Sequence, residues 1–106
     1  MSDTEEARIC FLLMICETEF SRHVVALLDE MGVPGHTSFS GISGLGRSGR
    51  REDSDIWPGG NSIILVALPD DAVADEVVTR AEQIIADNYR KRPGFAAFKL
   101  HGTQVA

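Results

Sequence analysis

The segment Arg8–Cys16 is apolar at nearly every position, and it constrains the fold more than any other part of the chain. In a strand, successive side chains point to opposite faces, so the residues alternating from Ile9 and those alternating from Cys10 form two apolar faces. Such a strand belongs in the middle of a sheet that is covered on both sides. Asn61–Leu68 is a second strand of this kind, rich in β-branched residues.

Each of these strands is followed by an amphipathic helix. Thr18–Met31 carries apolar residues at helical spacing, and we expect Thr18 to cap it and Gly32 to end it. The second helix begins after Pro69 with Asp70 as its predicted cap and runs to about Tyr89. The two apolar stripes must pack on a sheet, because neither helix can bury its stripe alone.

The remaining segments complete the order strand, helix, strand, strand, helix, strand. His36–Ser43 is a weaker strand, Gly44–Gly60 is a long loop, and Phe95–His101 is the last strand. This order predicts an α+β, ferredoxin-like βαββαβ fold, with a four-stranded antiparallel sheet and both helices on one face. Because the central strands are apolar on both faces, we also predict an oligomer that packs sheet to sheet.

Length and charge limit the class of protein. The 106 residues predict one domain over residues 8–106, after a flexible polar tail of residues 1–7. The formal net charge of -6 argues against nucleic acid as a partner. No apolar run reaches the roughly 18 residues that a membrane span needs, and the first apolar segment has no basic leader. We therefore expect a cytoplasmic protein without membrane insertion.

The bases form two clusters that could bind an anion. They are Arg47, Arg50 and Arg51 in the long loop, and Arg90, Lys91 and Arg92 after the second helix. The loop also contains the pattern G-x-G-x-x-G, but no helical period follows it, so it is not a dinucleotide fingerprint. Its glycines would let backbone N–H groups approach a phosphate. Trp57 either packs the stem of the loop or stacks on a base.

Motifs for catalysis are scarce, so we predict that the chain is not an enzyme. The three histidines are scattered, and no serine lies in a nucleophile elbow. Cys10 and Cys16 share one strand face about 20 Å apart, too far for a disulfide, and are expected to be buried thiols.

Three blocks resemble the nitrogen regulatory PII signalling proteins and their PII-like relatives. Met31–Thr37 resembles the turn into their second strand, Gly44–Arg47 resembles the base of their T-loop, and Pro69–Val73 resembles the start of their second helix. All three blocks agree in register, and the resemblance covers about residues 8–101. The PII B-loop motif is absent after the second helix, and residues 44–60 contain no tyrosine for uridylylation.

The resemblance implies a homotrimer whose three sheets face inward. It also implies ligand sites between subunits, where the base of the T-loop meets the loop after the second helix of a neighbour. The ligand would be a small anion, with ATP, ADP, AMP or a cyclic nucleotide as candidates, and no cofactor is required. The implied ligand-binding residues are Gly44, Gly46, Arg47, Ser48, Arg50, Arg51, Trp57, Arg90, Lys91 and Arg92.

The leading hypothesis is a non-enzymatic sensor. The ligand would bias the T-loop between two states, and the loop would act on a target protein such as a transporter or a metabolic enzyme. The alternative is a metal-responsive trimer of the CutA or PII-like type, with Cys10, Cys16, His36 and His101 as candidate ligands. A trimer whose loop tethers a partner without any ligand is the third hypothesis.

Overall fold

The computed structural model describes residues 7–42, 44–46, 49–51 and 60–106. The elements follow one another as β1 (Ala7–Glu17), α1 (Thr18–Glu30), β2 (Thr37–Ile42), β3 (Gly44–Gly46), β4 (Gly49–Arg51), β5 (Asn61–Leu68), α2 (Asp71–Asn88) and β6 (Phe95–Gln104). The predicted order of the six main elements is thus confirmed. β6 extends past the predicted end at His101, because Ala7–Ile9 of β1 supply partners for its last residues.

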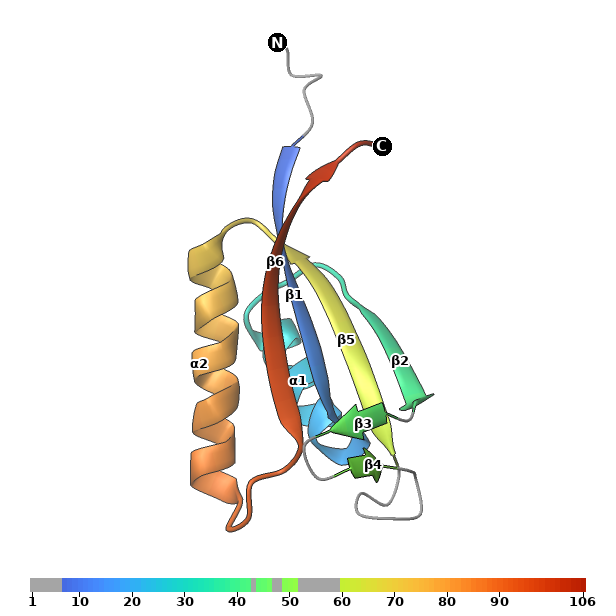
Figure 1. Cartoon of the computed structure of the whole chain (residues 1–106). Coiled ribbons are helices and arrows are strands. Elements are labelled where there is room, and N and C mark those ends of the chain that lie inside the picture. Colours follow the sequence, from blue (N-terminus) through green and yellow to red (C-terminus); the bar gives the residue numbers. More distant parts are fainter. Residues whose placement is uncertain (1–6, 43, 47–48, 52–59) are drawn as a thin grey trace.

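The main sheet has the strand order β2-β5-β1-β6, and every neighbouring pair is antiparallel. The two strands that are apolar on both faces, β1 and β5, lie in the middle, as predicted. Both helices lie on the same face of the sheet (Figure 1). This is the ferredoxin-like α+β arrangement that the sequence predicts.

Residues 44–60 were predicted to form a long loop, and two short strands that were not predicted lie within it. β3 and β4 pair with each other in a small antiparallel sheet, with Gly44 opposite Arg51 and Gly46 opposite Gly49. The sequence does not reveal these strands, because glycine is disfavoured in strands and the pairing rests on backbone hydrogen bonds. Residues 52–59 of the predicted loop lie outside the described residues.

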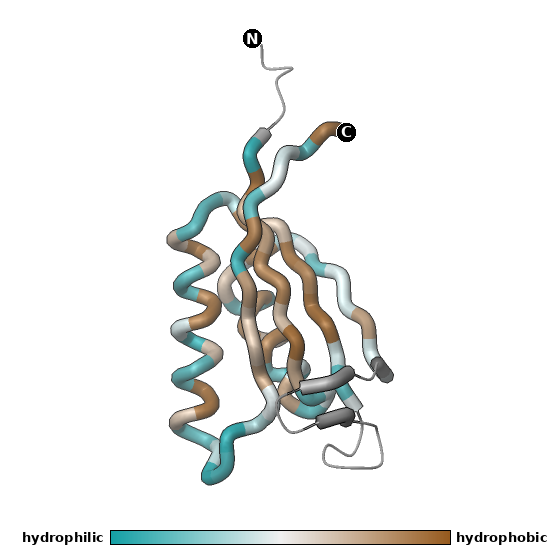
Figure 2. Tube along the Cα trace, viewed as in Figure 1, coloured by the Kyte–Doolittle hydropathy of each residue, from teal (hydrophilic) through white to brown (hydrophobic). Residues whose placement is uncertain are grey.

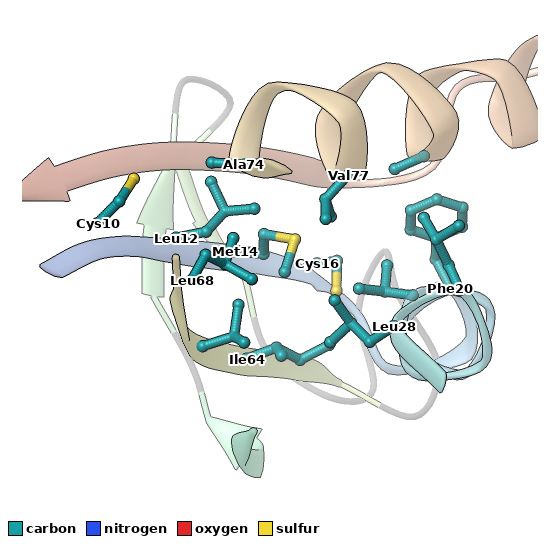
Figure 3. Close-up of a cluster of buried hydrophobic side chains, with 14 of the residues drawn as sticks. Cys10, Leu12, Met14, Cys16, Phe20, Leu28, Ile64, Leu68, Ala74 and Val77 are labelled. Atoms are coloured by element: carbon teal, nitrogen blue, oxygen red, sulfur yellow. The ribbon is translucent and has the colours of Figure 1, made fainter. Parts of the chain in front are cut away.

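The core lies between the sheet and the two helices. β1 contributes alternate side chains from Cys10 to Cys16, and all four are at most 3% exposed. They pack with side chains of β5, α1 and α2 (Figure 3). The main contributors from these elements are Phe20, Val24, Leu27, Leu28, Ile64, Val66, Leu68, Ala74, Val77, Ala81 and Ile85.

The helix ends agree with the predictions except at the start of α1. Asp70 caps α2, because its carboxylate accepts a hydrogen bond of 2.9 Å from the backbone N–H of Val73. Gly32 follows α1 with a φ of 78°, a conformation that glycine adopts without strain. Thr18 is not the cap of α1 but its first residue. Its hydroxyl is engaged instead with the hydroxyl of Ser62, at 3.0 Å.

The second face of the sheet is apolar and faces away from the helices. On this face, apolar residues of β1 lie opposite apolar residues of β6, as in Leu13 opposite Phe98 and Phe11 opposite Leu100. Phe39, Phe98 and Leu100 are 54%, 49% and 49% exposed. Figure 2 shows the hydrophobic colour running along the central strands. We call this surface the outer sheet face; it is the face that the predicted oligomer would bury.

Candidate functional site

The junction between β1 and α1 binds both segments in which the sequence predicts anion-binding residues. The N–H of Glu17 donates to the carbonyl of Gly94, and the N–H of Thr18 donates to the carbonyl of Gly60, each at 2.9 Å. The carboxylate of Glu17 also accepts a hydrogen bond of 2.7 Å from the N–H of Gly94. The end of the long loop and the turn between α2 and β6 are therefore held at the same end of the sheet.

The small β3–β4 sheet lies at this end as well (Figure 1). Its strands carry Gly44 and Gly46 on β3, and Arg50 and Arg51 on β4. Arg47, Ser48 and Trp57 lie outside the described residues. Their roles in ligand binding remain predictions, as does the change of state of the loop.

The turn after α2 carries the second basic cluster, and its three cations differ in their contacts. Arg90 and Lys91 are exposed. Arg92 instead binds the carboxylate of Glu82 with both terminal nitrogens, at 2.7 and 2.9 Å, and also contacts the carbonyl of Phe95 at 3.3 Å. The hydrogen bonds between them raise the pKa of Arg92 and lower that of Glu82. Arg92 thus ties the turn to α2, while Arg90 and Lys91 are presented to solvent.

A pocket of about 270 Å³ opens beside this turn, lined by Glu17, Glu19, Phe20, Tyr89 and Pro93. The rings of Phe20 and Tyr89 meet edge to face, with centroids 5.7 Å apart. Burial, and then the charges of the two glutamates, raise the pKa of Tyr89. The pocket is not apparent from the sequence, because its walls come from segments that are far apart in the chain. Its carboxylates repel phosphate, so an anion would have to bind on the basic side of the turn.

A different group of side chains gathers at the opposite end of β1. Cys10 and His101 are direct partners across β1 and β6, and Asp71 is the first residue of α2. Nε2 of His101 lies 2.7 Å from Oδ1 of Asp71. Burial, and then the neighbouring Asp71 carboxylate, raise the pKa of the Cys10 thiol. One donor atom from each side chain lies within 4.8 Å of the other two.

The structure brings together two of the four predicted metal ligands and separates the other two. Cys16 is fully buried, and burial raises the pKa of its thiol to about 12. His36 is exposed and precedes β2. Asp71 was not among the predicted ligands, because in the sequence it stands out only as part of the start of the second helix. His101 and the carboxyl group of Asp71 mainly interact with each other, and this hydrogen bond lowers the pKa of Asp71.

No protein-family model matches the chain, and no curated protein sequence matches it. Solved structures do match. CPII, a nitrogen regulatory PII-like protein from Thiomonas intermedia K12, bound to ADP, AMP and bicarbonate, superposes with a TM-score of 0.72 at 20% identity, over 97% of this chain and 93% of the other. A second structure of CPII, bound to ADP and bicarbonate, matches with the same TM-score and identity, over 97% and 94% of the two chains.

A structure from Thermus thermophilus, described as a PII-like signalling protein, matches with a TM-score of 0.60 at 18% identity. It covers 95% of this chain and 93% of the other. The chain therefore has the PII-like fold, which confirms the fold that the resemblance in sequence implies. Among the described residues, neither helix is long and apolar enough to cross a membrane.

Proposed function

We propose that this chain is a divergent PII-like regulatory protein of the cytoplasm that binds a small anion, foremost an adenine nucleotide. The observation that carries the proposal is the junction at Glu17 and Thr18, which holds the end of the long loop and the turn after α2 at one end of the sheet. Each of these segments supplies one of the two basic clusters. The similarity to CPII, which was solved with ADP, AMP and bicarbonate bound, supports an adenine nucleotide as the ligand.

The assembly that we propose is a homotrimer. The outer sheet face has an apolar row on each central strand, and its large side chains at Phe39, Phe98 and Leu100 are about half exposed in the single chain. Burying such a face against other copies removes apolar surface from water, which is the main driving force for association. In this trimer the ligand would lie between subunits, with the loop base of one facing the basic turn of its neighbour.

The proposed mechanism involves no chemistry on the ligand. Gly44 and Gly46 would let backbone N–H groups approach a phosphate, and Arg47, Ser48, Arg50 and Arg51 would supply charge and hydrogen bonds. Arg90, Lys91 and Arg92 would add positive charge from the turn, and Trp57 would stack on the base. Binding would favour one state of the loop, which would then act on a target protein such as a transporter or a metabolic enzyme.

Thermal unfolding with ATP, ADP, AMP, cyclic AMP and bicarbonate tests the proposal. A ligand at about 100 times its dissociation constant adds about 2.7 kcal/mol of stability if it binds only the folded protein. We expect one nucleotide to raise the melting temperature. If no anion raises it, the sensor function is wrong.

Variants of the basic residues then locate the site. Arg47→Ala and Lys91→Ala should each weaken binding by about 1.5–3 kcal/mol, the scale of a hydrogen bond to a charged group. Arg80→Ala is the matched control, because Arg80 is an exposed cation of α2 that pairs with Glu76 at 2.7 Å. Equal affinities of all three variants by calorimetry would remove both predicted residues from the site.

A further inference from the structure

Three side chains with different metal-binding atoms meet where β1 begins, α2 begins and β6 ends. The thiol of Cys10, a carboxylate oxygen of Asp71 and a ring nitrogen of His101 all lie within 4.8 Å of one another. Each of these side chains is attached to a regular helix or strand, so the backbone fixes its position. Cys10 and His101 face each other across the β1–β6 pair, and the cap formed by Asp70 fixes the start of the helix that carries Asp71.

The same three donors suit one class of metal ion. Zn²⁺ binds cysteine sulfur, histidine nitrogen and carboxylate oxygen at roughly 2.0–2.3 Å, usually in a tetrahedron. The donors around such an ion are then separated by roughly 3.3–3.8 Å, which follows from those bond lengths. Nε2 of His101 and Oδ1 of Asp71 are 2.7 Å apart. An ion between them would replace their hydrogen bond and needs the two atoms to separate by about 1 Å or less.

We propose that Cys10, Asp71 and His101 form a three-ligand site for Zn²⁺ or a similar borderline-soft divalent transition-metal ion, with the fourth position open to water. A thiolate and an imidazole select such ions over Mg²⁺ and Ca²⁺, which prefer oxygen ligands. The carboxylate and the imidazole are partly exposed, with 52% and 35% of their side-chain surface accessible, so an ion can reach the site.

The surroundings of Cys10 distinguish it from the other cysteine on the same face of β1. Cys16 lies deep in the core, toward Phe20, whereas Cys10 lies at the far end of the cluster (Figure 3). Of the two thiols, that of Cys10 is the one within 4.8 Å of a carboxylate oxygen and a ring nitrogen among the described residues.

Lys99 is the cation that would compete with a metal ion for the carboxylate of Asp71. Its Nζ lies 2.9 Å from a carboxylate oxygen of Asp75 and 3.9 Å from Oδ2 of Asp71. In the metal-free chain, Lys99 thus helps to balance the charge of Asp71. When an ion binds, Asp75 can keep Lys99 while Asp71 turns to the metal. The arrangement therefore allows binding without leaving a lysine unpaired.

This site is independent of the proposed nucleotide site. Cys10 and Glu17 are seven residues apart on β1, which corresponds to about 23 Å. The metal ligands lie on the helix-covered side of the sheet, so the proposed trimer, which buries the outer sheet face, leaves the exposed side chains of Asp71 and His101 accessible. Loss of one activity by mutation should therefore leave the other unchanged.

Titration of the reduced, metal-free full chain with Co²⁺ tests the proposal. A thiolate bound to Co²⁺ produces a charge-transfer band in the near ultraviolet, and four-coordinate Co²⁺ produces strong visible bands. We expect both with one ion per chain, and we expect Zn²⁺ to abolish them by displacement. Absence of a thiolate band, together with no binding of Zn²⁺ by calorimetry, would overturn the proposal.

Matched variants assign the ligands. Cys10→Ala should remove the thiolate band, and Asp71→Asn and His101→Ala should each weaken Zn²⁺ binding at least tenfold. The controls are Cys16→Ala on the same strand face, Asp75→Asn in the same helix and His36→Ala. Asp71→Asn conserves the shape of an exposed side chain, so it remains informative if Cys10→Ala does not fold.

Two outcomes contradict the assignment. One is that Cys16→Ala removes the thiolate band as well as Cys10→Ala does. The other is that Asp71→Asn binds Zn²⁺ as tightly as the parent chain. The nucleotide affinity of Asp71→Asn should equal that of the parent, so failure of the metal site would not be confused with failure of the sensor function.

Discussion

At the scale of single residues, Arg92 has a structural contact in addition to its proposed role in binding. The sequence places it in a basic cluster, and the structure pairs it with Glu82, with both side chains about half exposed at 51% and 43%. Such pairs contribute little, because water screens the charges and ordering the side chains costs entropy. The pair nevertheless links the turn that carries Arg90 and Lys91 to α2.

The Arg92–Glu82 pair should contribute a small, pH-dependent part of the stability. Arg92→Ala should lower the free energy of unfolding by roughly 0.5 kcal/mol at neutral pH, within the range of exposed pairs. Because the folded pKa of Glu82 is lowered, this contribution is present above the unfolded pKa and is lost as the pH falls through the folded pKa. Urea unfolding of both chains across the acid range measures it. A difference that grows in acid would contradict the assignment.

Cys16 should be inert in the native protein. Burial raises the pKa of its thiol to about 12, so almost no thiolate exists at neutral pH, and reagents cannot reach a fully buried side chain. We expect alkylation of Cys16 only after unfolding, as followed by mass spectrometry of the peptides. Rapid labelling of Cys16 in the folded chain would show that this end of the core opens readily.

At the scale of elements, local signals predict where helices begin better than where strands pair. Asp70 caps α2 as expected, because the bond from the backbone N–H of Val73 to its carboxylate lies within a few residues of sequence. Thr18 was wrongly predicted to cap α1, because its hydroxyl meets Ser62, a residue of β5 that the sequence does not place nearby. The β3–β4 pair is local in sequence, but it was missed because its glycines give no strand signal.

The cap of α2 should be worth about 1 kcal/mol. Asp70→Ala removes the acceptor for the Val73 N–H, and this substitution typically costs about 0.5–2 kcal/mol. Asp70→Asn is the matched control, since asparagine caps helices about as well as aspartate and should stay within a few tenths of a kcal/mol of the parent. Urea denaturation compares the three chains. Equal losses in both variants would indicate that the charge, and not the cap, matters.

At the scale of the whole molecule, the sheet has one face that the chain covers and one that it does not. The helices bury the inner face, and the outer sheet face keeps Phe39, Phe98 and Leu100 about half exposed. A polar face would be typical of a sheet that meets water. The proposed association through this face would explain why β1 and β5 are apolar at nearly every position.

A charge on the outer sheet face should prevent association. Phe98→Asp places a carboxylate opposite Leu13 in the β1–β6 register, and burying it without a partner is costly. We expect light scattering to give the mass of three chains for the parent and of one chain for the variant. Val105→Asp is the control, because Val105 is 78% exposed beyond the end of β6. A parent chain that is already monomeric would contradict the proposed trimer.

The sequence by itself determined the elements and the class of fold. Alternation in β1 and β5 and helical spacing in α1 and α2 are local periodicities, and each periodicity specifies one element and its buried side. The order of these helices and strands along the chain is then compatible with only a few folds. The basic clusters and the glycine pattern were also readable, since they are contiguous. The PII-like resemblance added the expected ligand class and assembly, which remain proposals here.

Only the tertiary structure decided which distant side chains meet. Cys10 and His101 come from opposite ends of the chain, and the register of β1 against β6 makes them partners. The start of α2 brings Asp71 to both. A shift of one residue in that register would turn the imidazole to the outer sheet face. The sequence therefore offered Cys10 and His101 as two of four candidate ligands, but it could not show that these two meet each other and Asp71. Contacts of this kind depend on long-range pairing, whereas helices and strands depend on neighbours in sequence.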